Sequence, residues 1–176
     1  MTVDFESLSQ VNDDVVGWIY SDDTPINYPV VQADDNQYYL HRLIDHSEDF
    51  AGSIFMDYRN TRNFYDLNTI LYGHNMKNQS MFSTLQAYND QDYFDTHPIL
   101  YLLTPKQAYK IELIASFGTT HTSDIYQIPD TYEKQVELLT TQSNSPYSLR
   151  ISLSKRMTDS SPSPPVMLSM TLPDLF

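Results

Sequence analysis

ILYGHNM, residues 70–76, joins an apolar β-type run to a polar loop. The run from Thr69 to Tyr72 has the residue types of a buried strand, and Gly73 marks its end. The strand is therefore expected to hold His74 rigidly at its mouth, where solvent can still reach the imidazole. The unperturbed histidine pKa of about 6.5 suits proton transfer near neutral pH. On spacing alone, a histidine after a strand is more often structural than catalytic.

Length and composition predict one domain with a substantial core. The chain has 176 residues, with 14 Tyr, 8 Phe and 1 Trp but only 4 Gly. A chain of this length buries about two thirds of its unfolded surface, and abundant aromatics favour β structure over disorder. We therefore expect residues 1–176 to form a single domain. Residues 1–15 form an N-terminal helical extension, and residues 157–176 form an atypical C-terminal tail.

Charge and residue content exclude several classes of function. The chain has 10 Lys and Arg against 23 Asp and Glu, a formal charge of −13, so nucleic acid would be repelled. It has no cysteine, which excludes disulfides and cysteine-based metal sites. No apolar run approaches the roughly 18 residues needed to span a bilayer, and no signal peptide is visible. Met1 is either the natural start or the cut end of a longer protein.

Hydrophobic periodicity predicts a mainly β domain with helices packed around it. Pro29 places its strand at a sheet edge or at a bulge. Alternation from Tyr109 to Phe117 indicates one buried face. The expected strands are 15–20, 26–32, 53–57, 68–72, 99–104, 109–117 and 166–171, and the expected helices are 3–12, 34–43, 79–88 and 131–142.

Several stretches together resemble class B sortases, the Gram-positive cysteine transpeptidases that join surface proteins to the cell wall or to pilin subunits. The resemblance covers about residues 5–150, in order and with fitting spacing. It rests on ND with VGWI (12–19), YPVV (28–31), Asn36 with YL (39–40), GSIFMDYRN (52–60), TILYGHNM (69–76) and SMF (80–82). The implied fold is a sortase-type closed β-barrel with N-terminal helices. A helix precedes the penultimate strand, which fits 131–142, and the final strand is expected to be missing because the chain stops at Phe176.

The resemblance implies a catalytic cysteine, histidine and arginine. His74 matches the histidine. The strand MLSMT, residues 167–171, puts Thr171 at the cysteine position, 171 − 74 = 97 residues after the histidine. Arg150 and Arg156 precede this strand, so the family arginine, about ten residues after the nucleophile, has no counterpart. A threonine hydroxyl is much harder to deprotonate than a thiol, so this chain is predicted to be inactive.

The implied activity is cleavage of a C-terminal sorting motif and transfer of the acyl chain to an amine, either of the cell wall or of a pilin lysine. The partners are therefore a sorting-motif peptide and an amine acceptor, without nucleic acid or cofactor. The implied place of action is the extracellular face of the cell membrane, reached only through an anchor absent from this chain. The alternative is a catalytically dead homologue that binds peptides or assists pilus assembly. By resemblance, Asn36, Leu40, Tyr72 and Ser169 line the substrate groove.

Other polar residues give weaker signals. No histidine pair has the spacing of a zinc site, and no acidic loop has calcium-type ligand spacing, so no metal is expected. The run SSPSPP at 160–165 differs in composition from the rest of the chain. With the early stop, it suggests that residues 157–176 arose from a shifted reading frame or an engineered change. The remaining histidines are His41, His46, His97 and His121.

Overall fold

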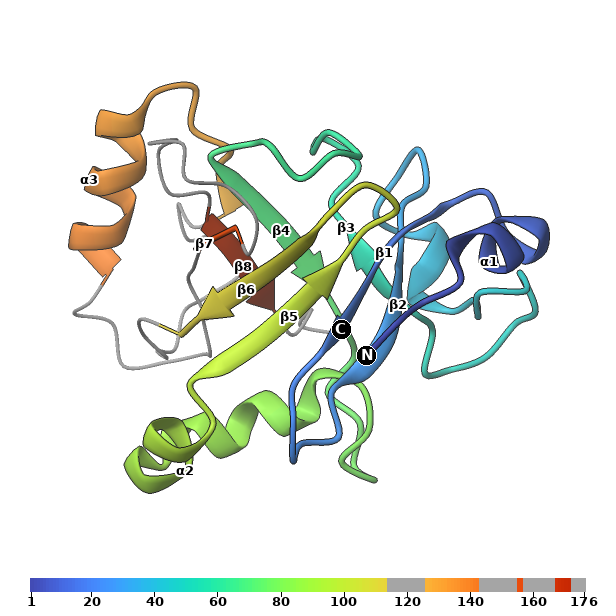
Figure 1. The fold of residues 1–176 in the computed structure, drawn as a ribbon, viewed down its shortest axis with the longest axis horizontal. Coiled ribbons are helices and arrows are strands. Elements are labelled where there is room, and N and C mark those ends of the chain that lie inside the picture. The colour runs from blue at the N-terminus through green and yellow to red at the C-terminus, as the bar shows by residue number, and fades with distance from the viewer. Residues whose placement is uncertain (114–125, 143–154, 157–166, 172–176) are drawn as a thin grey trace.

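One curled sheet of eight strands organises the residues that the computed structural model describes, namely 1–113, 126–142, 155–156 and 167–171 (Figure 1). The order across the sheet is β7-β6-β5-β1-β2-β3-β4-β8. The strands are β1 (Val15–Tyr20), β2 (Asn27–Val31), β3 (Ile54–Met56), β4 (Asn68–Tyr72), β5 (Ile99–Leu103), β6 (Ala108–Glu112), β7 (Lys155–Arg156) and β8 (Met167–Thr171).

The prediction of a mainly β fold is confirmed. The pairs β2–β3 and β4–β8 are parallel, and the other neighbouring pairs are antiparallel. Among the described residues the outermost strands, β7 and β8, are not paired with each other, so this part of the sheet is curled without closing. The predicted bounds of β1 and β4 match the structure. β7 is only two residues long and leaves no periodic pattern to detect.

The helices differ more from the sequence predictions. The helix α1 (Phe5–Val11) is capped at its N-terminus by Asp4, whose side chain accepts a hydrogen bond from the Ser7 amide at 3.0 Å. The helix α3 (Tyr132–Gln142) lies between β6 and β7, as expected. The predicted helix 34–43 is a single 3-10 turn, η1 (Tyr38–Leu40), and 79–88 is mainly a 3-10 helix, η2 (Phe82–Asn89). The helix α2 (Gln91–Thr96) was not predicted. Part of the predicted strand 109–117 lies outside the described residues.

Pro29 lies in an interior strand, so the predicted edge is wrong, but the β1–β2 register shifts between Val15 and Gly17, opposite the neighbouring Val30 and Val31, as it does at a β-bulge. Pro29 pairs with Trp18 of β1, but β3 pairs only with Val30 and Val31 of β2. Pro29, which has no amide hydrogen to donate, therefore lies one residue outside the part of β2 that pairs with β3.

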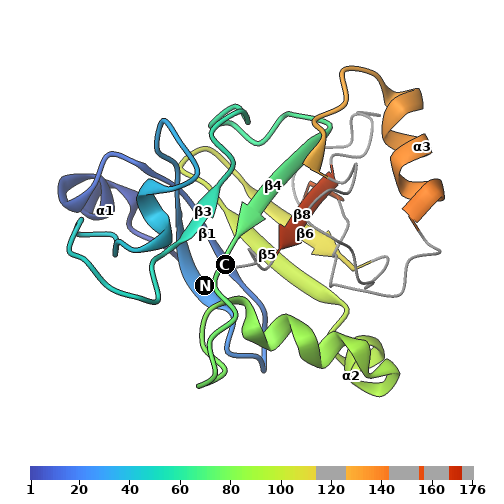
Figure 2. The same cartoon turned by 180° about the vertical axis from the view of Figure 1, so that it is seen from behind.

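Two buried clusters pack on β3 and β4 and position the ends of these strands. Met56 of β3, Leu71 of β4 and Met170 of β8 belong to one buried cluster that also contains Phe82 and Leu85 of η2. Phe55 and Tyr72 belong to a second cluster around Tyr39. α1 and α3 lie at opposite ends of the molecule in both views (Figures 1 and 2). No helix among the described residues is long and apolar enough to cross a membrane.

Candidate functional site

His74 follows β4 after one residue and is buried, with 1% of its surface exposed. Its Nε2 lies 2.6 Å from the carbonyl oxygen of Leu40. Because a carbonyl can only accept, Nε2 carries the proton, and in the neutral ring Nδ1 holds the lone pair. The expectation of a solvent-accessible imidazole is therefore wrong. The reason is that residues far from His74 in the sequence pack against it.

Two aromatic rings flank His74. The ring of His41 lies 5.5 Å away and that of Phe50 lies 5.8 Å away, measured between centroids. Phe50 itself is 70% exposed, an unusual position for a phenylalanine. Burial lowers the pKa of His74, the Leu40 hydrogen bond opposes this shift, and the nearby His41 adds to it. His74 is therefore held neutral at neutral pH.

This burial predicts a pH dependence of folding. The pKa of His74 is lower in the folded chain than in the unfolded chain, so only the unfolded state takes up a proton just below about pH 6.5. Stability should fall as the pH drops from that value through the folded pKa. His74→Gln keeps an amide donor for Leu40 and removes the titration. Thermal unfolding between pH 7.5 and pH 5 should show a smaller loss of stability in this variant.

His46→Gln, at an exposed histidine, is the matched comparison for His74→Gln. A proton NMR titration measures the pKa of His74 in the folded protein directly. The His74 signal is the one that is absent from the His74→Gln spectrum. A midpoint at or above about 6.5 would contradict the burial effect.

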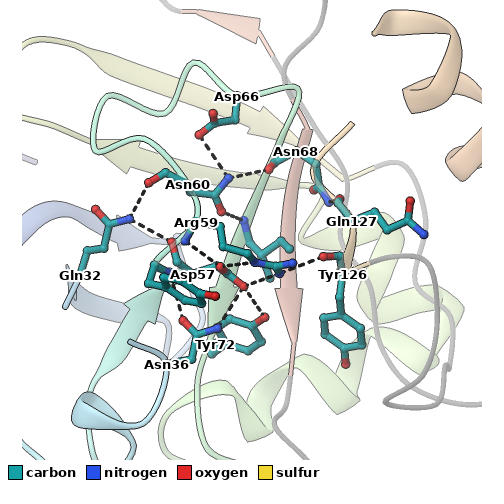
Figure 3. A network of polar contacts seen from close by, with 12 residues as sticks. Gln32, Asn36, Asp57, Arg59, Asn60, Asp66, Asn68, Tyr72, Tyr126 and Gln127 are labelled. Atoms are coloured by element: carbon teal, nitrogen blue, oxygen red, sulfur yellow. Dashed lines mark hydrogen bonds and ion pairs between the residues drawn. The ribbon is translucent and has the colours of Figure 1, made fainter. Parts of the chain in front are cut away.

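A buried carboxylate at the end of β3 organises a second set of polar contacts, shown in Figure 3. Asp57 has 0% of its surface exposed. Its Oδ1 accepts from the amide and Nε of Arg59 at 2.9 and 2.8 Å. Its Oδ2 accepts from Arg59 Nη2 at 2.7 Å, Tyr72 OH at 2.8 Å and Asn36 Nδ2 at 3.1 Å. Both oxygens are thus fully used.

These donors decide the charge of Asp57. Burial on its own raises the pKa of the carboxyl, but the hydrogen bonds from Arg59, Tyr72 and Asn36 outweigh it and lower the pKa below its usual range. Burial of the Tyr72 side chain, together with the negative charge of Asp57, raises the pKa of the Tyr72 hydroxyl. Asp57 is therefore an anion near neutral pH, and Tyr72 is a neutral donor to it.

The network reaches beyond Asp57 into neighbouring loops. Gln32 donates to the backbone oxygens of Asp57 and Asn60 at 2.9 and 2.8 Å. Asn60 donates to the Asn68 carbonyl at 2.8 Å and accepts from the Ile70 amide at 2.9 Å. The loop between β3 and β4 is thereby fixed on both strands, and this holds the end of β4 in place.

The predicted site residues separate into three groups. Asn36 and Tyr72 meet on Asp57, while the carbonyl of Leu40 meets His74. Ser169 and Thr171 lie on β8, where the parallel register pairs them with Ile70 and Tyr72. The backbone at Thr171 is thus next to the strand that precedes His74. The role of Thr171 as the residue at the nucleophile position stays a prediction.

Sequence reasoning missed the residues that connect this site. It assigned no role to Asp57 or Arg59, nor to Phe50 and Tyr126. One signal was available: a carboxylate directly after the buried run Ile54 to Met56, followed two residues later by an arginine, is typical of a charge that needs a partner at a strand end.

The other histidines have local partners. His46 Nδ1 lies 3.3 Å from Tyr38 OH, and the ring of His97 stacks on Tyr93 at 4.2 Å. His121 lies outside the described residues. Within the described ranges, no group of three or more His, Cys, Asp or Glu could hold a metal ion. A pocket of about 230 Å³ lies beside the start of β1 and the β5–β6 turn, and none of the predicted site residues lines it.

The curled sheet, the parallel β4–β8 pair and the histidine after β4 define a sortase-type fold. No family model matches the chain. Sortase B of Listeria monocytogenes is 40% identical over 155 residues, which cover 86% of this chain and 62% of that relative. Sortase B of Staphylococcus aureus is 38% identical over 122 residues, 69% of this chain and 50% of that relative. This chain therefore spans less than two thirds of either curated relative.

Solved structures extend the likeness to the fold. Sortase B of Bacillus anthracis in complex with AAEK1 is 36% identical, with a TM-score of 0.78 over 98% of this chain and 78% of that one. A sortase B complexed with triglycine is 33% identical, with a TM-score of 0.74 over 78% and 64%. The S. aureus sortase B–substrate complex is 28% identical, with a TM-score of 0.76 over 92% and 80%. The chain belongs to the class B sortase family.

Proposed function

We propose that this chain binds a sorting-motif peptide of a surface or pilin protein next to β4 and β8, and that as it stands it does not transfer the peptide. The observation that supports this function is the intact Asp57 network in a chain without cysteine. Asn36 and Tyr72, two of the residues expected to contact the peptide, are held in place by this network, whereas no thiol is present to act as the nucleophile. A substrate complex and a triglycine complex of related sortases support the choice of peptide and amine as partners.

The second candidate function is the full transpeptidation reaction: cleavage of the motif and transfer of the acyl chain to an amine. Membership of the family favours it, and so does the register that places Thr171 beside Tyr72. In this candidate, the Thr171 hydroxyl attacks the scissile carbonyl, and His74 takes the hydroxyl proton and returns it to the leaving amine. The Nε2 bond from His74 to Leu40 leaves Nδ1 as the only basic ring atom.

A binding and turnover experiment separates the two candidates. We expect the peptide substrate of S. aureus sortase B, labelled with fluorescein, to bind saturably, and a scrambled peptide to bind at least about 10-fold more weakly. With triglycine added as the amine, mass spectrometry should detect no transfer product. Product that His74→Ala abolishes would establish transpeptidation instead. Equal binding of both peptides would refute peptide recognition.

The place of action follows from the same proposal. A domain that handles surface or pilin proteins works at the extracellular face of the cell membrane, joined to it by a segment outside this chain. Protease treatment of intact cells that express the native protein should then digest this domain, while a cytoplasmic marker protein stays intact. Survival of the domain under these conditions would contradict this location.

A further inference from the structure

We propose that Asp57 and Arg59 form a positioning pair that sets how closely the chain at Tyr126 approaches Tyr72, and that this spacing tunes the affinity for the peptide. The inference rests on the proposed function, because the peptide is expected to bind over Tyr72. Neither residue is assigned to contact the peptide. Both act through the residues that they hold.

The first argument is the convergence of distant segments on one carboxylate. Asp57 binds Asn36, which lies 21 residues earlier, and Tyr72, which lies 15 residues later. These are two of the residues expected to contact the peptide. Because Asp57 is completely buried and ionised, each donor is held by a charge-assisted hydrogen bond, the stronger kind.

The second argument is the direction of Arg59. Its Nε and Nη2 bind the two oxygens of Asp57 as a fork, which fixes the plane of the guanidinium. The same Nη2 donates to the carbonyl oxygen of Tyr126, 67 residues further along the chain, at 2.9 Å. Figure 3 shows this bond extending from the network toward Tyr126. Asp57 therefore orients Arg59, and Arg59 holds the backbone at Tyr126.

The third argument is that Tyr72 meets the same segment by a separate contact. The rings of Tyr72 and Tyr126 are nearly parallel, with an interplanar angle of 8° and centroids 6.4 Å apart. Tyr126 is thus located by its carbonyl through Arg59 and by its ring through Tyr72. Arg59 and Tyr72 both donate hydrogen bonds to Asp57. The Asp57 carboxylate therefore positions both residues that contact Tyr126. The result is a rigid link between β4 and the segment that precedes α3.

Arg59 contributes to stability as well as to positioning. Its side chain is 43% exposed, whereas Asp57 is 0% exposed. Without Arg59 the buried Asp57 carboxylate keeps only Tyr72 and Asn36 as side-chain donors, so losing the fork costs stability. A displacement of about 1 Å at a binding site also costs much function. Peptide binding should therefore be compared well below the unfolding midpoint of each variant, where a lost affinity reports on positioning in a folded protein.

Three arginine variants test the inference with the labelled S. aureus sortase B peptide. Arg59→Gln removes the charge and the fork, and it should weaken binding about 10-fold or more, since the chain at Tyr126 is then no longer held at its place beside Tyr72. Arg59→Lys keeps the charge without the fork and should restore part of the affinity. Arg62→Gln is the matched control: Arg62 is 51% exposed and binds the Asp13 carbonyl at 2.6 Å and Asp14 at 3.7 Å. It should change affinity by less than about 2-fold.

A double variant shows whether the two residues act as a unit. If they do, Asp57→Asn together with Arg59→Gln should weaken binding no more than the stronger single change. Additive losses would show two independent effects and would overturn the pair. An unfolding midpoint that falls in proportion to the affinity across these variants would show a purely structural role.

A measurement without peptide keeps the inference testable on its own. The backbone amide of Gln127 should exchange its hydrogen faster in Arg59→Gln than in the wild type or in Arg62→Gln. Unchanged exchange would overturn the proposed link to Tyr126. If the wild type binds the sorting-motif peptide no more tightly than the scrambled peptide, the proposed function fails. If the wild type binds specifically and Arg59→Gln binds equally well, only the positioning pair fails.

Discussion

Asp57→Ala should lower the free energy of unfolding by about 3–5 kcal/mol, because it leaves several buried donors without an acceptor, at a cost of about 1–3 kcal/mol each. The change leaves Tyr72 OH, Asn36 Nδ2 and the Arg59 fork without their acceptor. For a chain of this size the melting temperature should fall by about 10 °C. Urea titration and thermal unfolding near neutral pH measure both values.

Two further variants control for Asp57→Ala. Asp130→Ala removes a carboxylate that is 72% exposed and bound to Lys134 at 2.7 Å, and it should leave the unfolding midpoint unchanged. Asp57→Asn keeps the size and part of the hydrogen bonding, so its loss should be intermediate. An Asp57→Ala protein as stable as Asp130→Ala would show that the network does not stabilise the fold.

Thr171→Cys should convert a chain without thiol chemistry into one that forms a covalent adduct with a sorting-motif peptide. Thr171 lies opposite Tyr72 in the register of β8 and β4, close to the strand that carries His74. A cysteine ionises with a pKa of about 8.5 and is intrinsically nucleophilic. Intact-mass spectrometry after incubation with the S. aureus sortase B peptide should show the acyl adduct in this variant, and no adduct in the wild type.

Transfer from this adduct to triglycine should remain slow. The resemblance implies an arginine after the nucleophile, and the 176 residues given have none after Arg156. If that arginine serves as an oxyanion donor, its lack should cost these residues about 100- to 1000-fold in rate. Ser9→Cys, at an exposed position of α1 outside the expected groove, is the thiol control and should form no adduct. Transfer by Thr171→Cys at the rate of an intact sortase B would show that the absent arginine is not needed.

The strand that leads to His74 could be predicted because its signals are local. An apolar β-type run ends at Gly73, and the structure has β4 over the predicted residues. The helix 79–88 was assigned the wrong type, although a local signal was present. Phe82, Leu85 and Tyr88 are the apolar residues buried in this element, and they recur every three residues, the period of a 3-10 helix, although Ser83 and Thr84 are buried as well.

The contacts that decide the state of the site could not be predicted from local pattern. His74 is buried because Leu40, His41 and Phe50 pack against it from 24 to 34 residues earlier in the chain. The charge of Asp57 depends on burial and on Arg59, two residues further on, and then on Tyr72 and Asn36, which no spacing rule connects to it. The family resemblance supplied Asn36 and Tyr72 as site residues, and the structure supplied the carboxylate that joins them.

The parallel pairing of β4 with β8 has a consequence for synthesis on the ribosome. β4 ends at Tyr72 and its partner ends at Thr171, which is 171 − 72 = 99 residues later. At about 5–20 residues per second, the ribosome leaves one edge of β4 without its partner for about 5–20 s. Exposed strand edges are templates for association with other chains. Newly made chains should therefore depend on chaperones until β8 emerges, and slow translation between these strands should increase aggregation.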